Sequence, residues 1–294
     1  MINFSVEEFE EKEETRENVY FSKCTKIFPT IKSPVCIPKI IMQSWKTKEV
    51  PDHWQISPKS IKHFMSDWQY VLMDDNDNRN MVKTHFPDFL PYFDAFPHNI
   101  MRADASRYVF LYLYGGLYLD LDFSLQRDLS PLFHSGSDVF LVCSGNIPSY
   151  YTNSFMASKP RAKFWLDVIE EMKKPPKWWY IGKHIEVMAV SGPVMLSRVA
   201  NRTKHVLSIV PKSLVMPCSI CNLQCSTCEA YLKPLEGSSW ISYDTVFYNF
   251  WLCHWKKVVS FLVILLLLLL IAYIVRRTGL SNNSLDIRDL FRNP

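Results

Sequence analysis

The segment 99–122 constrains the fold more than any other part of this 294-residue chain. Its first part places apolar residues at helical spacing, and Gly115 and Gly116 follow. Glycine adopts positive φ at the lowest cost, so this pair predicts the end of the helix. Alternating residues then predict a strand over 117–122, which ends in Asp120 and Asp122. The sequence therefore predicts an α/β unit in which two carboxylates emerge together at the end of a strand.

Two aspartates separated by one residue can share a divalent cation. Carboxylate oxygens suit Mg²⁺ or Mn²⁺, and two carboxylates leave coordination positions for the oxygens of a diphosphate. Asp104 and Arg107 lie three residues apart on the preceding helix and therefore share one of its faces. A bare D-x-D also occurs in solvated turns, so the prediction depends on the whole arrangement of D-x-x-R, apolar helix, glycine pair and Y-x-D-x-D.

This arrangement resembles the sugar-binding region containing the DXD motif in glycosyltransferases of the yeast initiating mannosyltransferase and inositol-phosphoceramide mannosyltransferase group. The resemblance implies a GT-A type fold, a nucleotide-sugar-binding α/β sandwich, with Mn²⁺ or Mg²⁺ as cofactor. It implies that Asp122 is the direct metal ligand and that Asp120 contacts the ribose and the metal's water shell. It also implies that Asp104 and Arg107 bind the hydroxyl groups of the donor sugar.

Two segments near the start of the predicted domain extend this resemblance. Residues 36–46 read C-I-P-K-I-I-M-Q-S-W-K, a buried strand followed by Trp45, which the resemblance places against the donor's base. Met42 stands where the family usually has histidine, so no role of that histidine is carried over. After a second predicted strand, 68–73, Asp74 begins an acidic loop that is typical of a contact to the nucleotide ribose. A polar turn explains this loop equally well.

A late G-S-S-W element resembles the family's loop that closes over the diphosphate. The resemblance implies that Ser238 contacts the phosphate and metal, and that Trp240 donates its indole N–H to the leaving-group oxygen. The histidine that often precedes this element is missing, and Glu236 is the candidate to replace it as a ligand. Within 151–158, Asn153 is the candidate on the acceptor side.

Four of the eight cysteines form two C-x-x-C pairs in close succession, Cys218 with Cys221 and Cys225 with Cys228. Thiolates in such pairs are zinc ligands, but most four-cysteine zinc sites have a longer loop between the pairs. Structural Zn²⁺, disulfides and free thiols all remain open from the sequence. Exposure to the cytosol favours zinc or thiols, whereas exposure to an oxidising lumen favours disulfides.

An uninterrupted apolar run, 258–275, lies between two basic pairs and contains no charged residue. At about 1.5 Å per residue it crosses most of a hydrocarbon core about 30 Å thick, so we predict a single membrane-spanning helix. Residues 1–20 are acidic and polar and do not resemble a signal peptide, which predicts a C-terminal anchor in an endoplasmic reticulum or Golgi-type membrane. The basic pairs leave the orientation open, and the sequon at Asn201 would be used only on the luminal side.

These features predict the organisation of the chain. The expected parts are an acidic arm over 1–34, a catalytic domain over 35–250 with a cysteine-rich insert at 218–228, the membrane helix over 258–275, and a short polar tail over 276–294. The formal net charge is +4 and no basic run alternates with aromatic residues, which argues against nucleic acid as a partner. The expected partners are a GDP- or UDP-linked sugar, a lipid or glycan acceptor, and the membrane.

The favoured reaction is metal-dependent, retaining transfer of a hexose to an acceptor hydroxyl, with mannosyl transfer to inositol-phosphoceramide as the favoured case. Transfer of galactose, glucose or N-acetylglucosamine to a glycoprotein glycan is an alternative. A phosphatase of the haloacid dehalogenase type also has D-x-D at a strand end, with Ser124 in the place of a later motif residue, but it leaves the D-x-x-R helix unexplained. A non-catalytic membrane adaptor on a transferase fold would explain Met42 and the missing late histidine.

Overall fold

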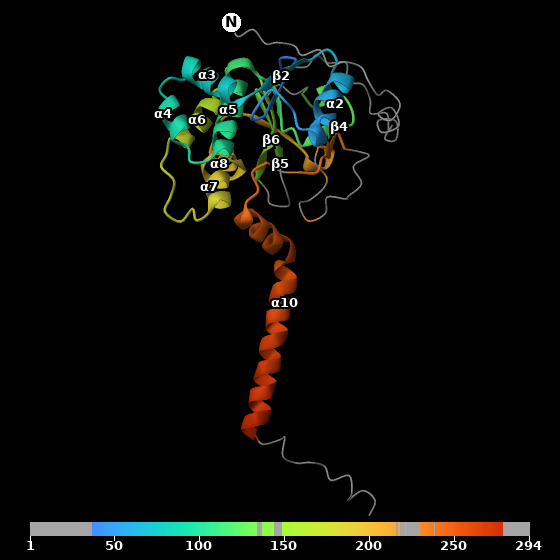
Figure 1. Ribbon diagram of the computed structural model, residues 1–294, viewed down its shortest axis with the longest axis vertical. Coiled ribbons are helices and arrows are strands. Elements are labelled where there is room, and N and C mark those ends of the chain that lie inside the picture. The colour runs from blue at the N-terminus through green and yellow to red at the C-terminus, as the bar shows by residue number, and fades with distance from the viewer. Residues whose placement is uncertain are drawn as a thin grey trace, which may run out of the picture. The chain divides into compact units, whose positions relative to one another are not determined.

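The computed structural model describes residues 37–133, 137–143, 149–215, 217, 221, 230–237 and 239–278. Contacts within the chain divide it into two compact units, Met1–Thr245 and Val246–Pro294. The first unit is an α/β domain that contains every strand of the described residues (Figure 1). The predicted acidic arm over 1–34 lies outside the described residues, as does most of the predicted tail over 276–294.

A six-stranded mixed sheet forms the centre of the domain, with strand order β2-β1-β3-β6-β5-β7. Its strands are β1 (Ile40–Ser44), β2 (Gln69–Met73), β3 (Gly116–Leu119), β5 (Val139–Cys143), β6 (Tyr151–Ser158) and β7 (Leu207–Val210). β1 is parallel to β2 and β3, β6 is antiparallel to β3 and β5, and β7 is parallel to β5. A small second sheet pairs β4 (Phe123–Leu125) with β8 (Leu232–Pro234).

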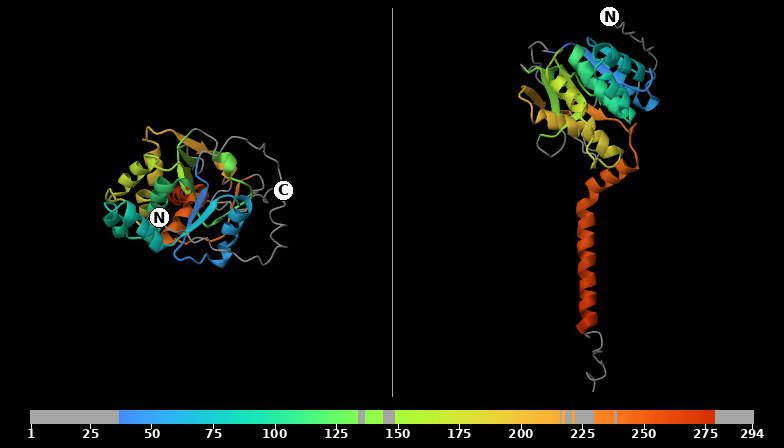
Figure 2. Two further views of the ribbon diagram at one scale, coloured as in Figure 1. Left: turned by 90° about the horizontal axis from the view of Figure 1, so that it is seen from above. Right: turned by 90° about the vertical axis from the view of Figure 1, so that its left-hand side faces the viewer.

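Helices pack on the two faces of the large sheet (Figure 1 and Figure 2). They are η2 (Asp52–Trp54), α2 (Ile56–Phe64), α3 (Asp75–His85), α4 (Leu90–Ala95), α5 (Asn99–Tyr114), η3 (Ser130–Phe133), α6 (Phe164–Met172), α7 (Lys183–Val190), α8 (Pro193–Ala200) and α9 (Lys212–Val215). Successive side chains of a strand point to opposite faces of the sheet, so neighbouring residues belong to different hydrophobic cores. Met42 and Tyr118 pack with α3, α5, α6 and α8, while Ile41 and Leu117 pack with α2. This is the α/β sandwich that the sequence predicts.

The glycine pair after α5 is required by the structure. Gly115 and Gly116 have φ of 67° and 83°, which favour glycine. A Cβ at Gly116 would lie 2.4 Å from the carbonyl oxygen of Ile40, and one at Gly115 would lie 2.7 Å from that of Ser158. The pair therefore ends the helix and lets β3 approach its neighbours.

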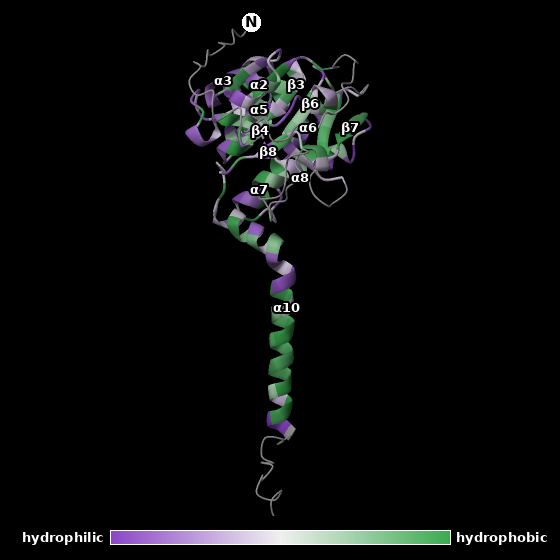
Figure 3. Cartoon of the chain, turned by 90° about the vertical axis from the view of Figure 1, so that its right-hand side faces the viewer, coloured by the Kyte–Doolittle hydropathy of each residue, from purple (hydrophilic) through white to green (hydrophobic). Residues whose placement is uncertain are grey.

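Most of α10 (Tyr243–Thr278) belongs to the second unit. The stretch Tyr243–Arg277 is long and apolar enough to cross a membrane, and its most apolar part has no buried residue (Figure 3). The predicted C-terminal apolar helix over 258–275 is thus confirmed as a helix.

The cysteine-rich insert is described only at one of its cysteines. Cys221 is disulfide-bonded, and so is Cys253 in α10. A sulfur in a disulfide is not a thiolate ligand, so the structure argues against a zinc site that uses Cys221. Cys218, Cys225 and Cys228 lie outside the described residues. Among the residues that are described, no group of three or more His, Cys, Asp or Glu side chains could hold a metal ion.

Candidate active site

The ends of three parallel strands define the edge of the sheet where the candidate site lies. β1, β2 and β3 run in one direction, so the residues that follow them meet at the same edge. β3 ends at Leu119, earlier than predicted, and Asp120 and Asp122 lie in the turn after it. The antiparallel β6 brings Asn153 to the same edge, where the N–H of Asp120 donates to the carbonyl of Ser154 at 2.9 Å.

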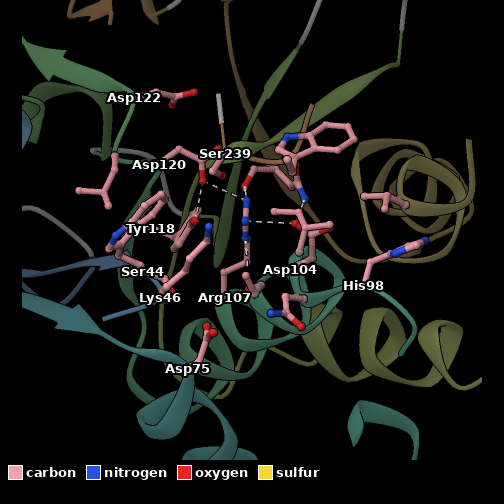
Figure 4. Close-up of a pocket in the computed structure, with 18 of the residues that line it drawn as sticks. Ser44, Lys46, Asp75, His98, Asp104, Arg107, Tyr118, Asp120, Asp122 and Ser239 are labelled. Carbon is pink, nitrogen blue, oxygen red and sulfur yellow. Dashed lines mark hydrogen bonds and ion pairs between the residues drawn. The ribbon is translucent and has the colours of Figure 1, made fainter. Parts of the chain in front are cut away.

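A cavity of about 420 Å³ opens at this edge (Figure 4). This volume lies within the range of about 300–1,000 Å³ that is typical of small-molecule sites. Six of the residues singled out from the sequence line it: Trp45, Asp104, Arg107, Asp120, Asp122 and Trp240. Asn153, the acceptor-side candidate, lines it as well. The fold thus gathers residues from the end of β1, from α5, from the turn after β3 and from the segment before α10.

Arg107 is the buried cation of the site. Its Nη2 lies 3.1 Å from Asp104 Oδ1, and its Nη1 lies 3.1 Å from Asp120 Oδ1. Nη1 also donates to the carbonyl of Asn153 at 2.8 Å, and the guanidinium carbon lies 4.3 Å from the centre of the Tyr118 ring. Burial alone would lower the pKa of Arg107, but Tyr118, Asp120 and Asp104 raise it by more. The residue therefore stays charged and holds α5 to the turn after β3.

Asp104 is buried, and both of its oxygens are engaged. Ser191 Oγ donates to Oδ2 at 2.7 Å, and Asn153 Nδ2 donates to Oδ1 at 2.9 Å, beside Arg107. Burial raises the pKa of Asp104 to about 6, although Arg107, Ser191 and Asn153 each lower it. The predicted pair of Asp104 and Arg107 is thus formed and held by neighbouring groups. Its contact with a donor sugar stays a prediction.

The two aspartates of the D-x-D motif have different surroundings. Asp120 Oδ1 accepts from the Tyr118 hydroxyl at 2.5 Å and from Arg107. Asp122 Oδ1 is buried and has no hydrogen-bond partner among the described residues. Burial, followed by the charge of Asp120, raises the pKa of Asp122 to about 7. A divalent cation would stabilise such a buried, unpartnered carboxylate oxygen beside a second carboxylate, so these residues fit the expected ion.

Two tryptophans line the cavity from separate segments. Trp45 packs edge-on against Trp54 with ring centres 5.1 Å apart, and Trp54 donates its indole N–H to the carbonyl of Glu236 at 3.0 Å. Trp240 stacks on His184, with ring centres 5.4 Å apart and an interplanar angle of 10°. Within the described part of the chain, no residue accepts a hydrogen bond from the indole N–H of Trp240. This N–H is therefore available to a ligand.

Of the residues predicted from the sequence, Asp74 and Glu236 are not among the described residues that line the cavity. Asp74 is the N-cap of α3, where it accepts from the N–H of Asp77 at 2.8 Å, and Asp75 lines the cavity in its place. Ser238 lies outside the described residues, whereas Ser239 lines the cavity. The side chain of Glu236 is exposed and does not belong to the lining, so the structure gives it no role as a ligand.

Met42, in the place of the family's histidine, is fully buried in the core and does not line the cavity. The neighbouring Gln43 is a positioning residue that the sequence reading missed. Its Nε2 donates to Ser57 Oγ at 2.8 Å and to the carbonyl of Asp120 at 3.3 Å, and its Oε1 accepts from the Tyr70 hydroxyl at 3.0 Å. A long polar side chain next to the apolar run Ile40–Met42 of β1 is the available signal. Gln43 ties β1 to the D-x-D turn.

The geometry disfavours the phosphatase alternative. Ser124 is fully buried in β4, so it is not available to a substrate. The first aspartate of the motif, Asp120, would be the nucleophile of such an enzyme, and one of its two oxygens, Oδ1, is engaged by Tyr118 and Arg107.

Comparison with known proteins agrees with the site. Residues 51–138 match the family described as glycosyltransferase sugar-binding region containing DXD motif. The matched region contains α5, the glycine pair and both aspartates of the motif. Over this region the chain is similar to the DXD-motif glycosyltransferases.

This chain has relatives among proteins that are named for mannosyl transfer in two yeasts. It is 34% identical over 247 residues to inositol phosphoceramide mannosyltransferase 3 of Schizosaccharomyces pombe, covering 81% of this chain and 65% of that protein. It is 35% identical over 172 residues to a mannosyl phosphorylinositol ceramide synthase of Saccharomyces cerevisiae, covering 58% and 44%. Identity to inositol phosphoceramide mannosyltransferase 1 of Schizosaccharomyces pombe is 27% over 265 residues, covering 87% and 80%. The chain thus spans less than two thirds of the first two relatives.

Proposed function

We propose that this chain transfers a mannosyl group from a nucleoside-diphosphate sugar to the inositol of a phosphorylinositol ceramide, with Mn²⁺ or Mg²⁺ as cofactor. One observation carries the proposal: a single cavity collects the D-x-D aspartates, the Asp104–Arg107 pair and the indole N–H of Trp240, which no described residue engages. The names of the relatives support the choice of sugar and acceptor.

The main barrier to this reaction is the departure of a diphosphate from the anomeric carbon. A divalent cation, when bound, neutralises charge on the diphosphate as a Lewis acid, and Asp122 and Asp120 are the residues that would hold it. Trp240 donates its indole N–H to the leaving-group oxygen, where negative charge develops. The stack on His184 fixes the plane of that indole, so the donor needs little reorganisation during the reaction.

The donor sugar is positioned by groups that are themselves held in place. Asn153 Nδ2 donates to Asp104 and to the Tyr108 hydroxyl, which fixes the amide with its oxygen turned away from the carboxylate. No described residue donates to Asn153 Oδ1, so this oxygen is available to a sugar hydroxyl. Arg107 pairs with both Asp104 and Asp120 and so fixes the positions of the two carboxylates relative to each other. Fixed carboxylates limit the orientations in which the donor can bind.

We infer that transfer proceeds with retention, the acceptor attacking on the face from which the diphosphate leaves. This course needs no covalent nucleophile. The engaged oxygens of Asp104 support it, because hydrogen bonds hold both of them and this side chain is not poised to attack the anomeric carbon.

We also propose that α10 anchors the domain in a membrane and that the domain faces an oxidising lumen. The disulfide at Cys221 supports this side, because disulfides persist in oxidising compartments. The exposed Asn201 of the sequon then carries a glycan. We expect a loss of mass on endoglycosidase treatment of an Asn3→Gln chain, which removes the other N-x-S/T sequence on the same side of α10, and no such loss in the double variant Asn3→Gln, Asn201→Gln. A chain without glycan whose cysteines are reduced in cells would place the domain in the cytosol.

The function is tested with the full chain reconstituted in phosphatidylcholine bilayers that contain inositol phosphoceramide. Metal-depleted samples receive GDP-mannose or UDP-hexoses, with and without Mn²⁺. We expect a mannosylated lipid that requires the metal, that is lost in Asp122→Asn, and that is retained in Asp138→Asn, a change at an exposed aspartate outside the cavity. Absence of any donor turnover would refute the transferase proposal, and turnover that labels only protein would refute the lipid acceptor.

A further inference from the structure

The loop that joins α6 to α7, defined here as residues 173–183 with the first residue of α7 included (Figure 1), presents large apolar side chains to solvent. Trp178 is 87% exposed, Ile181 is 77% exposed and Trp179 is 50% exposed. The neighbouring Tyr180 instead packs against the hydrophobic core and anchors the loop. Exposed tryptophans in a row are unusual on the surface of a domain, and they indicate an interaction site.

The chemistry of this loop is that of a membrane interface. Residues 173–183 read K-K-P-P-K-W-W-Y-I-G-K, with four lysines and no acidic residue. Lys177 lies 4.9 Å from the centre of the Trp179 ring and forms no ion pair with a described residue. Tryptophan beside lysine suits the headgroup level of a bilayer, where the ring meets the acyl boundary and the ammonium meets anionic phosphates.

The backbone and the ring contacts of the loop restrict the conformations of its exposed side chains. Pro175 and Pro176 have restricted φ and no N–H, which narrows the conformations of the preceding turn. Trp178 packs edge-on against Trp179 at 5.5 Å, and Trp179 packs edge-on against Tyr180 at 6.1 Å. The aromatic side chains therefore form a connected group that ends in the core.

The loop also lies where the chain leaves the domain. The N–H of His184 donates to Asp244 Oδ2 at 2.7 Å, and His184 Nδ1 lies 3.2 Å from Thr245 Oγ1. Gly182 is equally close, since a Cβ there would lie 2.9 Å from Asp244 Oδ2. The end of the exposed loop is therefore held against the last residues of the first unit.

The connection to the apolar run is short. Residues 246–257 are helical in α10, which gives them a length of about 18 Å. With 258–275 in a membrane, the exit point of the domain cannot move far from the bilayer. A loop that is fixed at this exit point is within reach of the same surface.

We propose that residues 173–183 form a second membrane contact, in which Trp178, Trp179 and Ile181 enter the interface of an anionic bilayer. The proposal rests on the membrane anchor proposed above. Lys183, the first residue of α7 and the last of this segment, lines the cavity and donates to the carbonyl of Trp240 at 3.0 Å. Docking of the loop therefore brings one wall of the cavity to the level of lipid headgroups, where an inositol phosphate acceptor is located.

A photocrosslinking experiment tests the contact without any measurement of activity. The full chain is reconstituted in nanodiscs of phosphatidylcholine, with or without phosphatidylinositol, with photoreactive p-benzoylphenylalanine in place of Trp178, of Ile181 or of Val206. Val206 is the matched control, because it is as exposed as Ile181 at 77% but precedes β7. We expect lipid adducts at positions 178 and 181 and none at 206, with more adduct when phosphatidylinositol is present.

Absence of adducts at 178 and 181, equal adducts at 206, or crosslinks in native membranes to protein alone would overturn the proposal. A second measurement uses the triple change Trp178→Ser, Trp179→Ser and Ile181→Ser. We expect a rise of about tenfold in the KM for a bilayer-embedded acceptor and unchanged hydrolysis of the donor, whereas Val206→Ser alters neither. An unchanged KM would overturn the role in acceptor access. If no donor is turned over, the proposed function fails while the lipid adducts still decide the membrane contact.

Discussion

Arg107 Nη1 lies 3.1 Å from Asp120 Oδ1, and this buried ion pair joins the helix α5 to the turn that carries the D-x-D motif. The same guanidinium contacts Asp104 on its other side. One cation therefore sets the distance between the two groups that the sequence assigns to sugar and metal. The planar fork of arginine suits this task, because it can reach two carboxylates at once.

Arg107→Lys keeps the charge but not the fork. A single ammonium cannot hold both carboxylates, so one buried acid loses its partner, at a cost of about 3 kcal/mol in the free energy of unfolding. We expect kcat/KM for donor hydrolysis to fall by about 100-fold. Arg102→Lys is the matched control on the same helix, since Arg102 donates to Phe96 and Asn99 and does not line the cavity. Equal kinetics for the two variants would contradict the role of Arg107.

Trp240→Phe removes the indole N–H and keeps an aromatic ring against His184. If this N–H donates to the departing oxygen, its interaction strengthens only as charge develops, so kcat falls by about 10- to 100-fold while the KM for the donor changes little. Donor hydrolysis kinetics measure both values. Trp179→Phe, outside the cavity, is the control. A rise in KM with unchanged kcat would instead assign Trp240 to ground-state binding of the donor.

The central part of the site could be predicted because its signals are local. The helix over 99–114, the glycine pair and the strand that follows depend on residues close in sequence, and the structure has them as α5, Gly115, Gly116 and β3. The spacing of Asp104 and Arg107 on one helical turn sufficed to place them together.

Other parts depend on contacts that no local pattern reveals. Asp104 is held by Asn153, 49 residues away, and by Ser191, 87 residues away, so these partners follow only from the tertiary fold. The sequence predicts an acidic loop from Asp74, where the structure instead begins the helix α3, because this segment is polar and the buried apolar residues of the helix are only Met81 and Val82. Its capping box was the local signal that could have identified it.

Gly116→Ala should be strongly destabilising. Its φ of 83° is costly for alanine, and the new Cβ would meet the carbonyl oxygen of Ile40 at 2.4 Å. We expect a loss of at least about 3 kcal/mol in the free energy of unfolding. Gly237→Ala is the comparison, because Gly237 also has positive φ but its Cβ would meet side-chain rings, those of Trp54 at 3.3 Å and His53 at 3.4 Å, and no backbone atom at so short a distance as in Gly116. A thermal unfolding series on the full chain should rank the two in this order, and the reverse order would contradict it.

Asp104 should give the folded protein a distinctive pH dependence. Burial raises its pKa to about 6 from an ordinary value of 3.8, so the folded state binds this proton more tightly than the unfolded state. The stability due to the protonated form is therefore fully present below 3.8 and is lost as the pH rises through about 6.

Asp104→Asn isolates this effect, because asparagine resembles the neutral acid and does not ionise. We expect the stability of the variant relative to the native chain to improve by about 3 kcal/mol as the pH rises from about 4 to about 7, followed as the difference in melting temperature. Ser191→Ala removes a hydrogen bond that lowers the pKa of Asp104 and should move the upper end of this window to higher pH. A difference that stays constant across the window would show that Asp104 is ionised at all these pH values, and that its charge is compensated by Arg107 more fully than its burial indicates.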